Sequence, residues 1–306
     1  MIFVIYLLVK SLKVNKMNVS EKIINSKNFM GWNTASHLNT FNFWNSYSNR
    51  TFNFSYGNFQ ENRFLVDTLR NNDVKSVVDI GCATGTSYRL LKNNFTHSEF
   101  EYAGFDISEV AIQHAFSIYK KPIFFSSNSH DFKDLDPSKR DIIFSRDTVM
   151  HQEEPLKFLR KLIKYASRFL IIRLRTRDNG KTNWNVNQSC QMHYDKHWMP
   201  YIVINTDELV DFIIKVRKPA SISINKSYEI LGGNNYRYLP KDLYFSSAGG
   251  AETSILIDFK RLNNKETIIE TTKRLEGQQF LQKNRLKYIV HRKIDQFLSR
   301  GKQVTI

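Results

Sequence analysis

Hydrophobic residues along this chain fall into two alternating patterns. Short apolar runs that start near residues 77, 102, 122, 141 and 169 predict buried strands. Between these runs, apolar positions recur every three or four residues, which predicts helices; one such helix face holds Leu156, Leu159, Leu162 and Ile163. Strands that alternate with helices indicate an α/β domain with a mostly parallel sheet. A length of 306 residues suits one large domain with additions, or two small domains.

The stretch at 77–91, VVDIGCATGTSYRLL, combines the end of a strand, a tight turn and the start of a helix. Asp79, Gly81, Ala83 and Gly85 occupy alternating positions in it. Glycine suits such a turn because a β-carbon would keep a ligand away from the backbone, and because glycine tolerates positive φ. This is the arrangement with which α/β folds hold nucleotide-like ligands. The dinucleotide fingerprint G-x-G-x-x-G does not fit, because positions 83 and 86 are Ala and Thr.

This loop resembles the D-x-G-x-G-x-G loop of class I S-adenosylmethionine-dependent methyltransferases, with alanine in place of the middle glycine. The resemblance extends over residues 60–260. It implies a Rossmann-like, mostly parallel sheet of seven strands with helices on both faces, ending in a hairpin-like pair whose last strand is antiparallel. S-adenosylmethionine would bind at the carboxyl ends of the first strands. The implied cofactor contacts are Asp79, Gly81, Cys82, Ala83, Gly85, Asp106, Ile107, Asp131, Phe132 and Arg146.

Asp106 ends the second strand, 21 positions beyond Gly85. A carboxylate there can accept hydrogen bonds from two ribose hydroxyls, which we favour over a helix-capping role. Ser108 is expected to cap the helix that follows. By the same resemblance, Asp131 and Phe132 would contact the adenine, with Asn128 or Asp134 as alternatives to Asp131.

The loop after the fourth strand carries Arg146, Asp147 and His151, which in the resembled family would face the methyl group. His151 is the plausible general base, because a histidine can take a proton from a hydroxyl or amine near neutral pH. A purely structural histidine that hydrogen-bonds the loop remains an equal alternative. Asp147 would hold the acceptor or orient His151.

Arg173, Arg175 and Arg177 alternate along one predicted strand and so share one face. They form either an anion-binding row for the substrate or a solvated edge. The polar insertion at 178–205 is long enough to be a substrate lid, and His193 and His197 are candidate substrate contacts in it. Cys190 and these two histidines lack a fourth ligand nearby, so no metal site is predicted.

Residues 1–59 precede the domain, and aromatic side chains are dense in the stretch 28–59. They are expected to pack over the domain or to cap the cofactor site, with Trp44 and Tyr47 as the candidate contacts. The first nine residues are apolar but too few to span a membrane. A short interfacial anchor and an upstream extension that starts before Met17 remain alternatives. Two cysteines are too few for a disulfide scaffold, so a cytoplasmic setting is expected.

The net charge of +16 is high for a chain in which 41% of residues are apolar and 24% charged. Half of this excess lies in the last 47 residues, where twelve Lys or Arg oppose four Asp or Glu. The segment 261–306 is therefore expected to be a basic tail with a helix at 280–298. Such a helix packs on the domain, pairs with another chain, or lies on an anionic membrane. The sequence predicts no oligomeric state.

The resemblance implies methyl transfer to the oxygen or nitrogen of a small-molecule acceptor. The arginine row and the insertion suit an anionic acceptor, such as a sugar or glycan intermediate. The basic charge alone favours the alternative of an RNA or protein methyltransferase, but no RNA-binding module is recognisable, so nucleic acid is not the favoured partner. A cofactor-binding protein whose partner carries out the chemistry is the non-enzymatic alternative.

Overall fold

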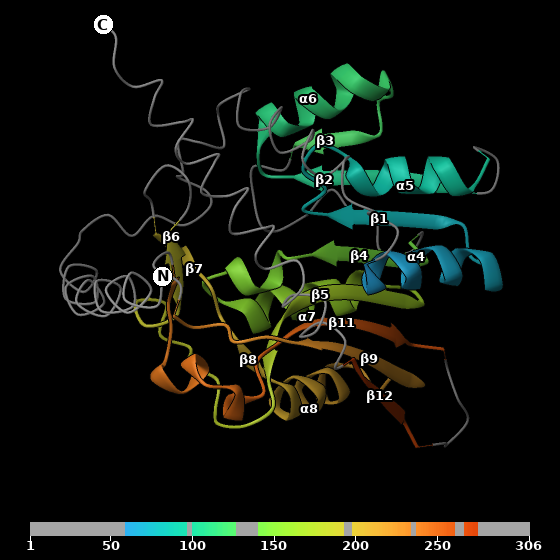
Figure 1. The fold of residues 1–306 in the computed structure, drawn as a ribbon. Coiled ribbons are helices and arrows are strands. Elements are labelled where there is room, and N and C mark those ends of the chain that lie inside the picture. The colour runs from blue at the N-terminus through green and yellow to red at the C-terminus, as the bar shows by residue number, and fades with distance from the viewer. Residues whose placement is uncertain are drawn as a thin grey trace, which may run out of the picture.

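A twisted sheet forms the centre of the molecule in the computed structural model, which describes residues 59–96, 100–126, 140–192, 198–233, 237–260 and 266–274. Within these ranges the sheet has nine strands, in the order β12-β9-β11-β5-β4-β1-β2-β3, and the short β8 pairs with β5. Figure 1 shows this order from β3 at the top to β12 at the bottom. The strands are β1 Ser76–Ile80, β2 Glu101–Asp106, β3 Phe124–Ser126, β4 Ile142–Arg146, β5 Phe169–Arg177, β8 Ile204–Asn205, β9 Ser221–Tyr228, β11 Ala251–Asp258 and β12 Ile268–Arg274.

The sheet is mostly parallel and ends with an antiparallel strand pair, which confirms the predicted strand directions. β1 pairs in parallel with β2 and β4, β2 with β3, and β4 with β5. β11 lies between β5 and β9 and is antiparallel to both. The central strands read as continuous apolar runs because helices cover both of their faces.

Helices cover the sheet in two sets. Apolar side chains of α4 (Gln60–Asn71), α5 (Thr86–Asn94) and α6 (Glu109–Tyr119) pack in one core with Val77, Ile142 and Phe144. Those of α7 (Pro155–Tyr165) and α8 (Thr206–Val216) pack in the other core with Val78 and Ile143. Neighbouring residues of β1 and β4 thus face opposite layers, as the period of a strand requires. No helix within the described ranges is long and apolar enough to cross a membrane.

The prediction of seven strands is wrong in number. β12 adds a parallel strand beyond β9, and β8 pairs with the last two residues of β5. β12 has the sequence IIETTKR, whose β-branched residues favour a strand. It belongs to the stretch 261–306 that was expected to be tail, so the sheet continues past the predicted boundary at 260. The helix expected at 280–298 and the segment 1–58 lie outside the described residues.

The insertion at 178–205 contains more regular structure than expected. β6 (Cys190–Met192) pairs with β7 (Trp198–Pro200) and with β10 (Arg237–Tyr238) in a small antiparallel sheet. Two short 3-10 helices, η6 (Lys241–Tyr244) and η7 (Ser246–Ala248), follow β10. Strands of two or three residues are too short to leave a readable period in the sequence. Because β8 continues from this region onto the end of β5, the small sheet lies at the carboxyl ends of the central strands.

Candidate functional site

The loop between β1 and α5 adopts the strained backbone that its glycines predict. Gly81 and Gly85 have φ of 80° and 77°, in the left-handed region. A β-carbon on Gly81 would lie 2.4 Å from Thr148 Oγ1, and one on Gly85 would lie 2.7 Å from the Phe124 ring. Ala83 has φ of 48° and carries its methyl group in a conformation that glycine adopts more easily. The backbone of this loop is therefore held tightly in one shape.

Asp106 braces this loop from the end of β2. Its Oδ2 accepts a hydrogen bond from Ala83 N at 2.9 Å, and its Oδ1 accepts one from Ser108 N at 2.9 Å. Ser108 in turn caps α6, as expected, by accepting from Ala111 N. Burial raises the pKa of Asp106, although these backbone N–H groups partly offset the effect. A carboxylate oxygen can accept more than one hydrogen bond, so the ribose contact stays a prediction.

Asp79 points into the core between β1 and β2. It is buried, and Tyr102 Oη donates to its Oδ2 at 2.7 Å. Burial raises the pKa of Asp79 to about 6, against the effect of hydrogen bonds from Tyr102 and Ser87. Cys82 is also buried, beside Gly104, and burial raises its pKa well above the usual range. Neither side chain faces solvent, so the loop would offer a ligand mainly backbone at these positions.

Thr84 is the residue of this loop that sequence reasoning missed. Its side chain is fully buried, and its Oγ1 has no hydrogen-bond partner among the described residues. A buried hydroxyl without a partner is costly unless a ligand or water satisfies it. Ile107, the other predicted contact here, is half-buried directly after Asp106. Asp131 and Phe132, expected at the adenine, lie outside the described residues.

The segment after β4 places a carboxylate among three arginines. Asp147 has a φ of 55°, and its carboxylate contacts Arg173 at 3.0 Å and Arg175 at 3.2 Å. Burial alone would raise the pKa of Asp147, but Arg173, Arg175 and Arg146 more than offset this and lower it to about 2. Asp147 is therefore ionised at every physiological pH and acts as a fixed negative charge.

His151 lies one turn further on, in the 3-10 helix η5 (Val149–His151). Its Nδ1 is 2.8 Å from Pro200 O, and because a carbonyl only accepts, Nδ1 carries the proton. Burial lowers the pKa of His151 to about 4, although the contact with Pro200 opposes the shift. The imidazole is thus neutral near pH 7, with the lone pair on Nε2. The structure ties this histidine to the insertion through Pro200.

The arginine row of β5 is buried, so the alternative of a solvated edge is wrong. Arg173 contacts Glu61 at 3.0 Å and Glu252 at 3.1 Å. Arg175 contacts Glu252 at 2.9 Å and Glu229 at 3.3 Å. Arg177 pairs with Asp242 of η6. Each guanidinium has a carboxylate partner, and the role of the row in binding an anionic substrate stays a prediction.

Glu61 of α4 is a member of this cluster that sequence reasoning missed. Only 1% of its side chain is exposed, and it contacts Arg146 at 2.8 Å and accepts from Ser254 Oγ at 2.9 Å. Its signal in the sequence was an acid next to the apolar face of an amphipathic helix. The partners of Glu61 come from β4, β5 and β11, so only the folded sheet reveals them.

Candidate metal ligands do not gather in the described residues: no group of three or more His, Cys, Asp or Glu there could hold an ion. Cys190 is buried in β6. His193 and His197 lie outside the described residues, so their substrate role stays a prediction.

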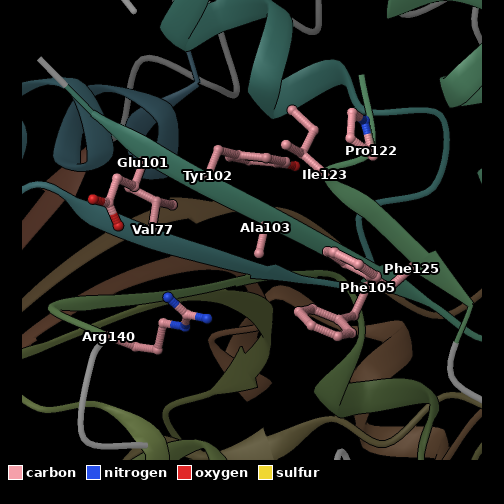
Figure 2. Close-up of a pocket in the computed structure, with 9 residues that line it drawn as sticks. All are labelled: Val77, Glu101, Tyr102, Ala103, Phe105, Pro122, Ile123, Phe125 and Arg140. Atoms are coloured by element: carbon pink, nitrogen blue, oxygen red, sulfur yellow. The ribbon is translucent and has the colours of Figure 1, made fainter. Parts of the chain in front are cut away.

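A hollow of about 350 Å³ lies on the face of β1, β2 and β3. Figure 2 shows Phe105 and Phe125 at one end of it and Glu101 with Arg140 at the other. The two phenyl rings stack with centroids 5.2 Å apart. None of the predicted site residues lines this hollow, so it is distinct from the site at the glycine loop.

The fold and the site together define an α/β protein whose first βα loop is shaped for a nucleotide-like ligand. A family model described as "Methyltransferase domain" matches residues 71–231, which is more than half of the chain. The chain therefore belongs to the methyltransferase domain family, which confirms the resemblance of its glycine loop. No curated protein matches its sequence significantly.

Several solved structures share a distant similarity with this chain. Phosphoethanolamine N-methyltransferase 2 of Haemonchus contortus, solved with phosphomonomethylethanolamine and S-adenosylhomocysteine, is 13% identical with a TM-score of 0.45, over 67% of this chain and 54% of that one. The chain thus spans about half of that enzyme. The [4+2]-cyclase SpnF is 12% identical with a TM-score of 0.43, over 68% and 81% of the two chains. Magnesium protoporphyrin IX methyltransferase of Synechocystis PCC 6803, solved with S-adenosylmethionine, is 15% identical with a TM-score of 0.37, over 65% and 78%.

Proposed function

We propose that this chain binds S-adenosylmethionine at the loop between β1 and α5 and transfers its methyl group to the oxygen or nitrogen of a small-molecule acceptor. The observation that carries the proposal is the strained loop at 81–85, braced by the Asp106 carboxylate. The unpartnered Thr84 hydroxyl in that loop, for which the described residues supply no hydrogen bond, fits a polar ligand lying against it. Bound there, the sulfonium would supply a methyl group that is already activated for displacement.

The residues after β4 have properties that suit the acceptor side. His151 is neutral near pH 7, so its Nε2 lone pair can accept the proton that the acceptor releases. Asp147 stays ionised and holds Arg173 and Arg175 in fixed positions. Asp147 and the two arginines would favour the reaction by orienting the acceptor, while His151 takes its proton.

The anionic sugar or glycan intermediate remains a narrower prediction about the acceptor. Its support is the alternation of Arg173, Arg175 and Arg177 along β5. An anion bound there would compete with Glu252, Glu229 or Asp242 for the guanidinium groups. A panel of hexoses, aminohexoses and hexose 1-phosphates, assayed for S-adenosylhomocysteine formation, compares neutral with anionic acceptors directly.

Titration calorimetry with S-adenosylmethionine and S-adenosylhomocysteine tests the cofactor site. We expect micromolar binding by the wild type, at least a tenfold loss in Asp106→Asn, and no change in Asp211→Ala, which removes an exposed carboxylate from α8. Asparagine keeps the shape of Asp106 but replaces one acceptor oxygen by an NH2 donor, which would face Ala83 N or Ser108 N where the carboxylate presents an acceptor, and which leaves one oxygen fewer to accept from a ribose hydroxyl.

NAD serves as the control ligand for this titration and is expected not to bind. A folded protein, freed of co-purified ligand, that binds neither methyl donor nor its product would overturn the proposal. If Asp106→Asn and the wild type had equal affinity for S-adenosylmethionine, the protein would still bind this cofactor, but Asp106 would not be one of its contacts.

A further inference from the structure

Tyr201 lies beside His151, in the connection between β7 and β8. Its backbone N donates to Ser189 O at 2.8 Å, and the next residue, Ile202, donates to Met150 O at 2.9 Å. The segment is therefore fastened both to the insertion and to η5. Pro200, directly before Tyr201, accepts the hydrogen bond from His151 Nδ1. One short piece of chain thus positions the imidazole and the phenol together.

The phenol ring of Tyr201 is held in place on several sides. It belongs to a small apolar core with Met150, Leu239 and Leu243. The guanidinium of Arg237 lies over the ring, 4.6 Å from its centroid. The His151 ring is tilted by 59° to it, with 5.8 Å between centroids. A side chain packed in this way cannot turn its hydroxyl elsewhere to find a partner.

The Tyr201 hydroxyl nevertheless has no hydrogen-bond partner among the described residues, although only 1% of the side chain is exposed. Buried hydroxyl groups are nearly always bonded, so an orphaned one marks a place where a ligand or water belongs. Burial raises the pKa of Tyr201, and the charged groups that act on it are Arg175, Arg237, Glu229 and Asp147. The phenol therefore keeps its proton and can both donate and accept.

The charges around this hydroxyl indicate the class of group that it binds. Two arginines, Arg175 and Arg237, act on it together with two carboxylates, Asp147 and Glu229. These charges balance at the hydroxyl, so the atom that Tyr201 itself binds need not be charged, whether or not the arginine row of β5 holds an anionic substituent of the acceptor. A neutral phenol beside a neutral imidazole suits a hydroxyl or amino group, whose donor and acceptor atoms they match.

We propose that Tyr201 binds the acceptor, and that its hydroxyl hydrogen-bonds the hydroxyl or amino group that is methylated, next to His151. This assignment rests on the proposed methyl transfer and names the part of the acceptor that the site recognises. Tyr201 moves no proton in this arrangement; it orients the acceptor atom, and His151 receives the proton that is released.

The variant Tyr201→Phe tests this role, because phenylalanine keeps the ring packing under Arg237 and removes only the hydroxyl. With the hexose or aminohexose of highest turnover in the panel above, we expect kcat/KM for the acceptor to fall about tenfold while the affinity for S-adenosylmethionine stays within twofold. The variant and the wild type are then compared on deoxy analogues of this acceptor, which keep the methylated group and lack one other hydroxyl. With each analogue, we expect kcat/KM of Tyr201→Phe to be about tenfold below that of the wild type again. Tyr165→Phe, which removes a partly buried phenolic hydroxyl from the last residue of α7, before β5 begins, is the matched control and should leave the acceptor kinetics unchanged.

Unchanged acceptor kinetics in Tyr201→Phe would overturn the assignment, provided that the wild type is active. The assignment would also be overturned if Tyr201→Phe and the wild type had equal kcat/KM with one of the deoxy analogues. Tyr201 would then bind the hydroxyl that this analogue lacks and not the methylated group.

If the wild type binds S-adenosylmethionine but methylates no panel compound, a crystal structure of the S-adenosylhomocysteine complex decides. A water or a soaked aminohexose bonded to the Tyr201 hydroxyl supports the assignment, whereas a bond to another side chain of the protein overturns it. These results can be told apart from a failure of the proposed function, because in that case the wild type would bind neither S-adenosylmethionine nor S-adenosylhomocysteine.

Discussion

His151 combines two properties that oppose each other in a general base. Its Nδ1 hydrogen bond to Pro200 O fixes the tautomer that leaves a lone pair on Nε2. Its burial, however, lowers its pKa to about 4, so the imidazole is a weak base. A weak base is enough when the attacked methyl group is strongly electrophilic and the proton leaves late in the reaction. At this residue, position matters more than basicity.

The variant His151→Asn separates these two properties. The asparagine side-chain amide can still donate to Pro200 O, so the insertion should keep its place, but the Nε2 lone pair is lost. We expect the affinity for S-adenosylmethionine to stay within twofold and turnover to fall at least tenfold, since general bases contribute about 10²-fold or more. Calorimetry and an S-adenosylhomocysteine assay measure the two quantities.

The pH profile provides the control for this prediction. A base with a pKa of about 4 is almost fully deprotonated above pH 6, so wild-type turnover should not rise between pH 6 and pH 8 on account of His151. Turnover in His151→Asn equal to that of the wild type would leave His151 with a structural role only.

Single residues were predictable from the sequence where their contacts are local. Ser108 caps the helix that starts one residue later, and Gly81 and Gly85 adopt positive φ within the turn they form. Glu61 and Tyr201 were missed because their neighbours come from distant parts of the chain. The alternation of Arg173, Arg175 and Arg177 showed that they share one face of the strand. It could not show whether water or carboxylates would cover that face.

At the scale of elements, a buried lysine connects three parts of the carboxyl-end layer. Lys226 of β9 contacts the carboxylate of Asp178, which follows β5, and the hydroxyl of Thr206, the first residue of α8. Tyr228 Oη also donates to Asp178, at 2.7 Å. Asp178 N in turn bonds Ala248 O of η7 at 3.1 Å. Lys226 therefore links β9 to the segments that surround the acceptor side.

We expect Lys226→Met to lower the free energy of unfolding by about 2 kcal/mol, because the substitution leaves Asp178 without its cation. The expected loss is smaller than for a fully buried pair, since Asp178 is partly exposed and keeps the bond from Tyr228. Urea unfolding measures the change. Lys215→Met, which removes an exposed lysine from α8, should stay within about 0.5 kcal/mol of the wild type. Equal stability of the two variants would contradict the linking role of Lys226.

Elements were predictable where they are long enough to show a period. The helix at Pro155–Tyr165 and the strand at Phe169–Arg177 lie where the apolar pattern indicated. The strands of the insertion were not predictable, because two or three residues carry no period. β12 has a strand-like composition, but its place beside β9 depends on a sheet edge that the sequence does not show.

At the scale of the whole molecule, two buried groups with opposite pKa shifts act on stability over the same pH range. The pKa of Asp79 is raised to about 6 in the folded state, so its contribution is complete below pH 4 and is lost as the pH rises through 6. The pKa of His151 is lowered to about 4, so its contribution is complete above pH 6.5 and is lost as the pH falls through 4. The two effects largely cancel between pH 4 and pH 6.

The variant Asp79→Asn should expose this cancellation. Relative to the wild type, its free energy of unfolding should rise by about 3 kcal/mol from pH 4 to pH 7, because a shift of one pKa unit corresponds to about 1.4 kcal/mol. The asparagine side chain carries no charge at any pH, but its amide oxygen still accepts from Tyr102 Oη, so packing is kept. Urea unfolding of both proteins across this range gives the difference directly. A difference that is constant with pH would show that Asp79 titrates normally.

The antiparallel position of β11 has a consequence for how the chain is made. On the ribosome, β1, β2, β4 and β5 are complete long before β11 is synthesised, and until then β5 presents an open, apolar edge. Ile172 meets its partner Ile255 only after β9 and the segments between β5 and β11 have been made, and Glu61 of α4 then meets Ser254. The edge of β5 that β11 covers therefore stays unpaired until the whole segment 178–250 has been synthesised.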